Sequence, residues 1–201
     1  SIHTTEDIHY LLIKRYDRFV DERGDIRRLH QEDFCQALGI VSEMKYQNEG
    51  GPSLKQCFEL VREVSSMPAV DLKRLLDAVL FNYLIGNHDA HGKNFSLLYH
   101  PKKTALAPLY DLVSTVYYSE LSPKMAMKIG ERYQSKEVLR RDFEKMSHEI
   151  GFSASGVLER IKKLAHDMME AIHSVKKTNE VQKKVIELIE KRCQYSLSTN
   201  C

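Results

Sequence analysis

Apolar residues recur at helical spacing through the middle of the chain. Ser53, with Gln56 three residues later, has the pattern of a capping box and predicts a helix from there to about Ser65. A second helix is expected to begin at Pro68 and to end at Gly86. Toward its end this helix is apolar on nearly all sides, so we expect it to lie at the buried centre of the domain.

The last third of the chain continues the helical periodicity. It predicts helices over residues 136–150, stopped by Gly151, over residues 155–175, and from Asn179 to about Tyr195. Helices therefore dominate the predicted structure.

Short apolar runs outside these helices predict strands. We expect a buried strand over residues 8–16, a hairpin with strands over 95–99 and 105–109, and a further strand over 125–129. The predicted fold class is α+β and mostly α, with a short β-hairpin at the active face.

Two shorter features precede the first long helix. Residues 21–24 read as a turn, and residues 31–38 as a short helix stopped by Gly39. Gly50-Gly51-Pro52 then interrupts regular secondary structure.

Composition and charge are ordinary for a globular protein. The chain has 201 residues, enough for one large domain or two small ones, with 42% hydrophobic and 29% charged residues. A net charge of +2 does not favour nucleic acid or membrane as the main partner. No apolar run is long enough to span a bilayer. The scattered cysteines fit reduced thiols, so we expect a cytoplasmic protein; these are Cys35, Cys57, Cys193 and Cys201.

Three oxygen-bearing side chains carry the candidate chemistry. Asp89 follows the predicted central helix, and Asn94 comes five residues later, before the predicted hairpin. Asp111 follows the hairpin, whose ends should return to one another. Protein kinases use this spacing to place a carboxylate at the acceptor hydroxyl and to hold magnesium through hard oxygen ligands. The sequence therefore favours the catalytic lobe of a kinase-like phosphotransferase.

Each of these residues has a plainer interpretation. Asp89 and Asp111 are also suited to capping a turn, and Asn94 to occupying one, but all three together favour the catalytic reading. His91 is as readily a loop histidine with satisfied hydrogen bonds as a phosphate contact. Lys93 is either a second group that balances phosphate charge or a solvated lysine.

The segment Gly86-Asn87-His88-Asp89 is also a motif of binuclear metallophosphoesterases. Asp7-Ile8-His9 supplies the Asp-x-His that such enzymes carry near their start. However, Gly24-Asp25 is not followed by the second Asp that those enzymes need, and a late Gly-His-x-His motif is missing. Too few ligands remain for a two-metal site, so this alternative is disfavoured.

Several blocks together resemble the HipA family of bacterial toxin–antitoxin kinases, specifically its C-terminal half. The blocks fall in the family's order between about residues 10 and 130; they are residues 13–18, 28–39, Lys45-Tyr46, Gly50-Gly51-Pro52, 87–98 and 106–115. Residues after about 135 match in pattern only.

The resemblance implies a two-lobed kinase-like fold that phosphorylates serine or threonine with ATP and Mg²⁺. Residues 1–20 would be the hinge-proximal strand at the end of the N-lobe, and residues 21–201 the helical C-terminal lobe. By analogy, Asp89 is the catalytic Asp, and Asn94 and Asp111 bind the metal.

The resemblance also implies a nucleotide site and partners. The strand end Lys14-Arg15-Tyr16 resembles the hinge that meets adenine, and Gln31 and Tyr110 fall where family members line the nucleotide pocket. His91 takes the position after the catalytic Asp at which protein kinases carry a phosphate-contacting Lys. Members of the family phosphorylate an aminoacyl-tRNA synthetase. They are silenced by a small DNA-binding antitoxin, so DNA is expected as a partner only through the antitoxin.

The chain also departs from the family pattern. We find no Gly-rich phosphate loop and no N-lobe strand Lys ahead of the hinge segment. Without them the clamp on the β- and γ-phosphates is missing, so we expect this chain alone to have little or no kinase activity. It would be a shortened copy, a fragment, or a lobe complemented by a separate chain. A kinase-derived binding module that docks an antitoxin or a complementing lobe is the alternative function.

Overall fold

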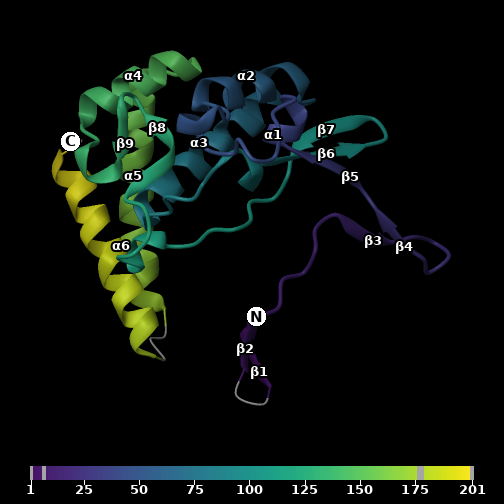
Figure 1. Cartoon of the computed structure of the whole chain (residues 1–201), viewed down its shortest axis with the longest axis horizontal. Coiled ribbons are helices and arrows are strands. Elements are labelled where there is room, and N and C mark those ends of the chain that lie inside the picture. Colours follow the sequence, from purple (N-terminus) through teal and green to yellow (C-terminus); the bar gives the residue numbers. More distant parts are fainter. Residues whose placement is uncertain (1, 6–7, 176–178, 200–201) are drawn as a thin grey trace.

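The computed structural model describes residues 2–5, 8–175 and 179–199. Figure 1 shows a helical body with small antiparallel sheets and an N-terminal segment that extends away from it. The described helices are α1 (Phe34–Ala37), α2 (Leu54–Val64), α3 (Pro68–Ile85), α4 (Arg140–Ile150), α5 (Ala154–Ser174) and α6 (Glu180–Thr199). Asp7 and Cys201, both considered above, lie outside the described residues, as do parts of the predicted unit 1–20.

The strands form four small antiparallel sheets in the described part of the chain. They pair as β1–β2, β3–β4, β5–β6–β7 and β8–β9. The bounds are β1 Ile2–Thr5, β2 Ile8–Leu11, β3 Arg18–Val20, β4 Ile26–Arg28, β5 His30–Asp33, β6 Ser96–His100, β7 Lys103–Leu106, β8 Lys124–Ile129 and β9 Arg132–Gln134. The prediction of a mostly helical α+β fold is confirmed.

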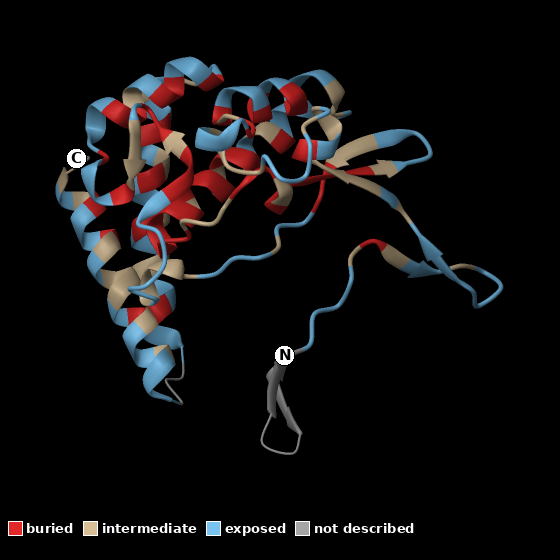
Figure 2. Ribbon diagram, viewed as in Figure 1, coloured by how far each residue is buried: buried red, intermediate tan, exposed pale blue. Residues whose placement is uncertain are grey.

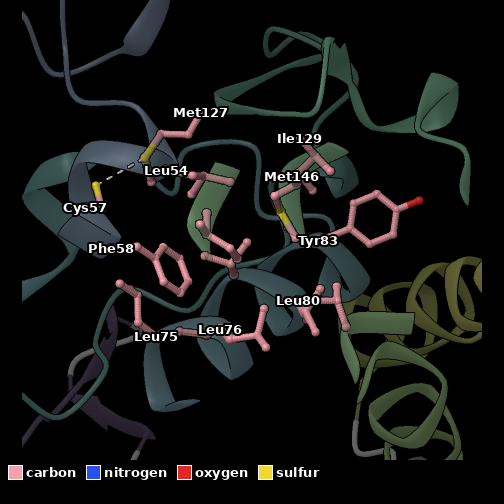
Figure 3. Packing of buried hydrophobic residues seen from close by; sticks show 14 of the residues in the cluster. Leu54, Cys57, Phe58, Leu75, Leu76, Leu80, Tyr83, Met127, Ile129 and Met146 are labelled. Carbon is pink, nitrogen blue, oxygen red and sulfur yellow. Dashed lines mark hydrogen bonds between the residues drawn. The ribbon is translucent and has the colours of Figure 1, made fainter. Parts of the chain in front are cut away.

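The centre of the body is α3, as predicted. Leu80 and Leu84 on this helix are fully buried, and α2, α5 and α6 pack around it. Figure 2 shows the buried residues concentrated where these helices meet. In Figure 3 Phe58 and Met127 reach the same core from α2 and β8, and the Cys57 sulfur lies 3.8 Å from that of Met127. Burying each such large apolar side chain contributes about 1.5–3 kcal/mol.

Several predicted element ends are confirmed by their caps. The Ser53 side chain accepts a hydrogen bond from the Gln56 N–H, and the Gln56 side chain reciprocates, so α2 begins as expected. Gly86 and Gly151 follow α3 and α4 in the left-handed conformation, with φ of +71° and +76°. The predicted hairpin is β6–β7, although β7 runs from 103 to 106 rather than from 105 to 109.

Three further predictions need correction. The buried strand over 8–16 is wrong beyond Leu11: β2 ends there, and Leu12 and Ile13 are 59% and 67% exposed. An apolar run predicts burial only where another element covers it. The helix expected over 31–38 covers only Phe34–Ala37, because Gln31 pairs with Leu98 in a sheet and Asp33 caps the helix.

The third correction concerns α4. It begins at Arg140 rather than at residue 136, because residues 135–137 form a separate 3₁₀ turn and the Asp142 carboxylate accepts the Leu139 N–H. The predicted turn at 21–24 is confirmed, and it joins β3 to β4, a hairpin that was not predicted.

Candidate active site

The loop that follows α3, residues 86–95, is hereafter called the catalytic loop, after the role predicted for Asp89. Asn87 holds it in place. Its amide Nδ2 donates to the Asn82 side chain at 2.9 Å and to the backbone carbonyl of Asp111 at 3.0 Å. Its Oδ1 accepts the Asp89 N–H at 3.2 Å. One buried side chain thus ties together α3, the Asp89 backbone and the Asp111 backbone.

Asp89 points into an open cleft, hereafter the acceptor cleft, of about 390 Å³. The Tyr46 hydroxyl donates to its Oδ1 at 2.6 Å, while Oδ2 lies 3.9 Å from His91 Nε2. The side chain is 43% exposed, which an acceptor hydroxyl requires. The cleft is lined by Tyr46, Asn48, Glu49, His88, Asp89, Thr115, Leu121, Ser122, Lys124 and Met125.

His91 is buried beneath Asp89. Its ring packs edge-on against Tyr46, with the ring centroids 5.5 Å apart. Burial lowers the pKa of His91 more than the Asp89 carboxylate raises it, which favours the neutral imidazole. A direct phosphate contact by this buried ring stays a prediction. Lys93 is half-buried, and its Nζ donates to Ser42 at 2.9 Å.

Asn94 and Asp111 meet as the hairpin geometry predicts. Asn94 Nδ2 donates to Asp111 Oδ2 at 2.5 Å, and Asn94 Oδ1 accepts the His91 N–H at 3.1 Å. Asp111 has a left-handed backbone, with φ of +57°, which is uncommon for a residue other than glycine.

The described residues contain no cluster of three or more His, Cys, Asp or Glu side chains that could hold a metal ion. The Asn94–Asp111 pair instead offers one amide and one carboxylate. That set fits Mg²⁺, which is commonly held by one or two protein oxygens together with water and substrate phosphates.

A second cleft, hereafter called the nucleotide cleft after the ligand predicted for its residues, has a volume of about 650 Å³. It brings together all four residues predicted to bind the nucleotide, with Asp111 at the same cleft. Its lining includes Lys14, Tyr16, Gln31, Ser96, Tyr110 and Asp111.

Polar and aromatic groups are arranged inside this cleft. The rings of Tyr16 and Tyr110 lie 6.1 Å apart at 31°. The Tyr110 hydroxyl donates to the Lys93 carbonyl at 2.6 Å, and burial raises the pKa of Tyr110 to about 12. Gln31 Oε1 is buried and has no hydrogen-bond partner among the described residues.

An ion cluster holds residues 13–17, the irregular segment that lines the nucleotide cleft. Asp17 is 2% exposed and accepts two hydrogen bonds from Arg15, at 2.7 and 2.8 Å. Arg18 also pairs with it, and Arg28 lies at 3.8 Å. The hydrogen bonds from Arg15 hold the pKa of the Asp17 carboxyl well below its usual range.

Three supporting residues could not be assigned from the sequence. Tyr46 and Asn87 lie inside blocks that resemble the HipA family, but the resemblance implies no role for them. Arg192 had no signal, because its contacts are remote in sequence. Its guanidinium donates to the carbonyls of Tyr83 at 2.6 Å and Leu84 at 3.2 Å, at the end of α3.

Arg192 also reaches the catalytic loop. It donates to the Ser135 hydroxyl at 3.2 Å, and the same hydroxyl is 2.8 Å from His88 Nε2. Burial and the nearby guanidinium of Arg192 lower the pKa of His88 to about 4. Helix α6 is thereby connected to the residue next to Asp89.

Sequence relatives of this chain are named as kinases. A Sinorhizobium fredii protein named "Putative kinase Y4mE" is 51% identical over 166 residues, covering 83% of this chain and 40% of that protein. The serine/threonine-protein kinase toxin HipA of Shewanella oneidensis is 29% identical over 178 residues, covering 82% of this chain and 41% of the toxin. The chain thus spans about two fifths of the length of these relatives.

The fold also has a solved counterpart. HipA of Shewanella oneidensis MR-1, solved in complex with HipB and operator DNA, superposes with a TM-score of 0.89 at 24% identity. The superposition covers all of this chain and 51% of that one. The fold is therefore that of a HipA-type, kinase-like C-lobe, as predicted. The family pattern of the HipA-like C-terminal domain matches residues 1–175, and the chain belongs to that family.

Proposed function

We propose that this chain is the catalytic C-lobe of an ATP- and Mg²⁺-dependent serine/threonine protein kinase. The observation that carries the proposal is the continuity of the site. The nucleotide cleft reaches Asp111, Asp111 is hydrogen-bonded to Asn94, and the loop that carries Asn94 presents Asp89 to a separate open cleft. A phosphoryl donor and a hydroxyl acceptor need such neighbouring clefts.

The nucleotide cleft offers groups suited to a nucleoside triphosphate. Tyr16 and Tyr110 supply ring surface for a base, and the unpartnered Gln31 Oε1 supplies an acceptor for an amino group. Lys14 adds positive charge at the same cleft. A buried acceptor without a partner is costly, so a ligand that donates to Gln31 gains affinity there.

Asn94 and Asp111 would hold Mg²⁺. When bound, the ion neutralises charge on the transferring phosphates. In the arrangement seen here Asn94 turns its amide nitrogen toward Asp111. Binding through Oδ1 therefore requires the Asn94 amide to rotate and to release the His91 N–H.

Asp89 would orient the acceptor hydroxyl and accept its proton. Its side chain is 43% exposed and lines the acceptor cleft, where a serine or threonine side chain can approach. The protein substrate that the family resemblance suggests is an aminoacyl-tRNA synthetase. The Shewanella oneidensis complex of HipA with HipB and operator DNA supports a small DNA-binding antitoxin as the partner, with DNA bound through it.

The test uses the complete gene product. We expect Asp89→Asn to lower phosphate transfer from labelled ATP by about 10²–10⁴-fold while MgATP binding, measured by calorimetry, is retained. Asp111→Ala should remove the Mg²⁺ dependence of ATP binding.

Asp167→Asn, an exposed site on α5, is the matched control and should behave as wild type. Full transfer activity in both site variants would refute the proposal, and antitoxin binding by an inactive wild-type protein would favour the binding-module alternative.

A further inference from the structure

We propose that Tyr46 is a positioning residue for phosphoryl transfer: its hydroxyl fixes one oxygen of Asp89 so that the other faces the acceptor hydroxyl. Residues 45–52, here named the Tyr46 clamp, would hold Tyr46 in place. The inference rests on the proposed function and assigns a role to the block Lys45-Tyr46…Gly50-Gly51-Pro52.

The contact itself is short and well defined. The Tyr46 hydroxyl lies 2.6 Å from Asp89 Oδ1, across 43 positions of sequence. Burial, together with the hydrogen bond to Asp89, raises the pKa of Tyr46 to about 12. The phenol is therefore a hydrogen-bond donor throughout the physiological pH range. Hydrogen bonds from a neutral donor to a carboxylate are stronger than those between neutral groups.

The clamp backbone folds tightly around Tyr46. The Tyr46 carbonyl accepts the N–H of Glu49 at 2.9 Å and that of Gly51 at 2.8 Å. A Cβ on Gly51 would lie 2.7 Å from the carbonyl carbon of Lys45, so only glycine fits there. Gly50 has a φ of +100°, which also favours glycine.

Two further contacts join the clamp to the site. Pro52 packs against the catalytic loop so closely that a Cβ on Gly92 would lie 2.4 Å from its Cγ. Gln47 Oε1 accepts the Lys128 N–H at 2.9 Å, while the Ala126 N–H on the same strand donates to the His88 carbonyl at 2.8 Å. The clamp, strand β8 and the catalytic loop are thus fixed to each other on both sides of Asp89.

The geometry gives the two Asp89 oxygens different tasks. Oδ1 is occupied by the phenol, which leaves Oδ2 to accept the proton of an acceptor hydroxyl. The hydroxyl oxygen then bonds to the γ-phosphorus, the bond from that phosphorus to the β–γ bridging oxygen breaks, and ADP leaves with that electron pair. Losing the phenol frees the carboxylate to rotate, which lowers the population of the productive orientation.

The kinetic test compares two phenylalanine variants of the complete gene product. Tyr46→Phe keeps the ring and removes only the hydroxyl; we expect kcat to fall about 10- to 100-fold, the equivalent of one charge-assisted hydrogen bond, with the KM for ATP within about twofold. Tyr99→Phe is the matched control, because the Tyr99 hydroxyl donates to the Glu32 carboxylate at 2.5 Å on the hairpin. It should leave kcat unchanged.

A second readout does not depend on activity. In protein labelled with ¹³C at tyrosine Cζ, the NMR resonance that is absent from the spectrum of Tyr46→Phe is assigned to Tyr46, and its pH titration gives the pKa. Replacing Asp89 by Asn removes the carboxylate, so the pKa of Tyr46 should fall from about 12 toward its ordinary 10, while the Tyr99 signal titrates as before.

The outcomes separate the two proposals. A wild-type protein that transfers no phosphate overturns the proposed function and this inference with it. An active wild type with kcat in Tyr46→Phe within twofold overturns the inference alone. An equal loss of kcat in Tyr99→Phe also overturns the inference. So does a Tyr46 pKa that is the same in Asp89→Asn as in wild type.

Discussion

The catalytic loop and the segment of residues 12–28, here called the N-terminal arm, both contribute to the nucleotide cleft, but they are held by different forces. In the loop, Asn87, His91 and Asn94 are buried; Asn87 donates to Asn82 on α3, and Asn94 accepts the His91 N–H. In the arm, Ile13 and Ile26 are 67% and 74% exposed. Figure 2 shows this contrast as a buried centre and a largely exposed arm.

The arm is held together mainly by charge. Asp17 is its buried residue, and the carboxylate pairs with Arg15 and Arg18, which also belong to the arm. The Leu29 N–H, just outside the arm, donates to the Asp17 carbonyl at 2.9 Å. Local stability follows buried contacts, so the loop should open only with the core, whereas the arm should open at lower cost. Under the proposed function, the groups assigned to metal and hydroxyl chemistry would therefore be preorganised, and the wall assigned to the base would be adjustable.

The largest effect is expected from Gly86→Ala in the loop. A Cβ there would lie 2.5 Å from Val116 Cγ2, and the residue has a φ of +71°. Left-handed strain and overpacking together should lower the free energy of unfolding by about 2–5 kcal/mol. Urea unfolding measures the loss.

Two further variants sharpen this result. Gly24→Ala in the arm has the same kind of backbone, with φ of +85°, but nothing within 4 Å of the new Cβ, so only the conformational cost of about 1–2 kcal/mol should appear. Adding Val116→Ala to Gly86→Ala should recover part of the packing loss. Equal destabilisation by Gly24→Ala and Gly86→Ala would contradict the proposed difference in packing between the catalytic loop and the N-terminal arm.

Arg192→Leu should produce the next largest loss. The partly buried guanidinium satisfies carbonyls at the end of α3, and its removal leaves them without this donor, at a cost of about 2–3 kcal/mol. Arg62→Leu is a matched control, because Arg62 donates to the Ile150 carbonyl at the end of α4, remote from Asp89. Amide exchange at Val116, whose N–H donates to the Gly86 carbonyl, should accelerate more in the first variant than in the second.

Lowering the pH should reduce the free energy of unfolding, because His88 in the catalytic loop has a lowered pKa. The pKa of His88 falls from its ordinary 6.5 to about 4 in the folded protein, so between these values the unfolded chain binds a proton that the folded chain does not. The stability present above pH 6.5 is therefore lost as pH falls toward 4. Unfolding at pH 7.5 and 5 should show a smaller pH dependence in His88→Gln than in wild type; an unchanged difference would exclude His88 as a cause.

The smallest global effect is expected from Asp17→Asn in the arm. The depressed pKa of Asp17 means that its stabilising contribution is present above the ordinary Asp pKa and is lost as pH falls below it. At neutral pH the variant should accelerate amide exchange at Leu29, with little change at Val116. Equal acceleration at both amides would show that arm and loop open together.

The sequence was most informative where the signal is local. The capping box at Ser53 and Gln56 and the glycines that end α3 and α4 could be predicted, because each depends on residues a few positions apart. The hairpin that joins Asn94 to Asp111 could be predicted because it is one continuous segment of the chain. Lys14, Tyr16, Gln31 and Tyr110 came from the family resemblance, and they do line one cleft. Their roles, like those of Asp89 and His91, stay predictions.

Contacts between remote segments could not be predicted. Tyr46 meets Asp89 across 43 positions, and Arg192 meets Tyr83 across 109. No periodicity encodes such a pair. The expected burial of residues 12–16 failed for a related reason, since an apolar run does not reveal whether another surface covers it.

Strand β5 carries a consequence for evolution by insertion and deletion. Gln31 and Asp33 face the nucleotide cleft, while Glu32, between them, points the other way and accepts the hydroxyl of Tyr99. Because successive side chains alternate, losing or gaining one residue just before this strand would exchange the two sets and turn His30 and Glu32 toward the base. Lineages that keep nucleotide recognition should therefore tolerate length changes in the distal turn at 21–25 far better than at the junction between β4 and β5.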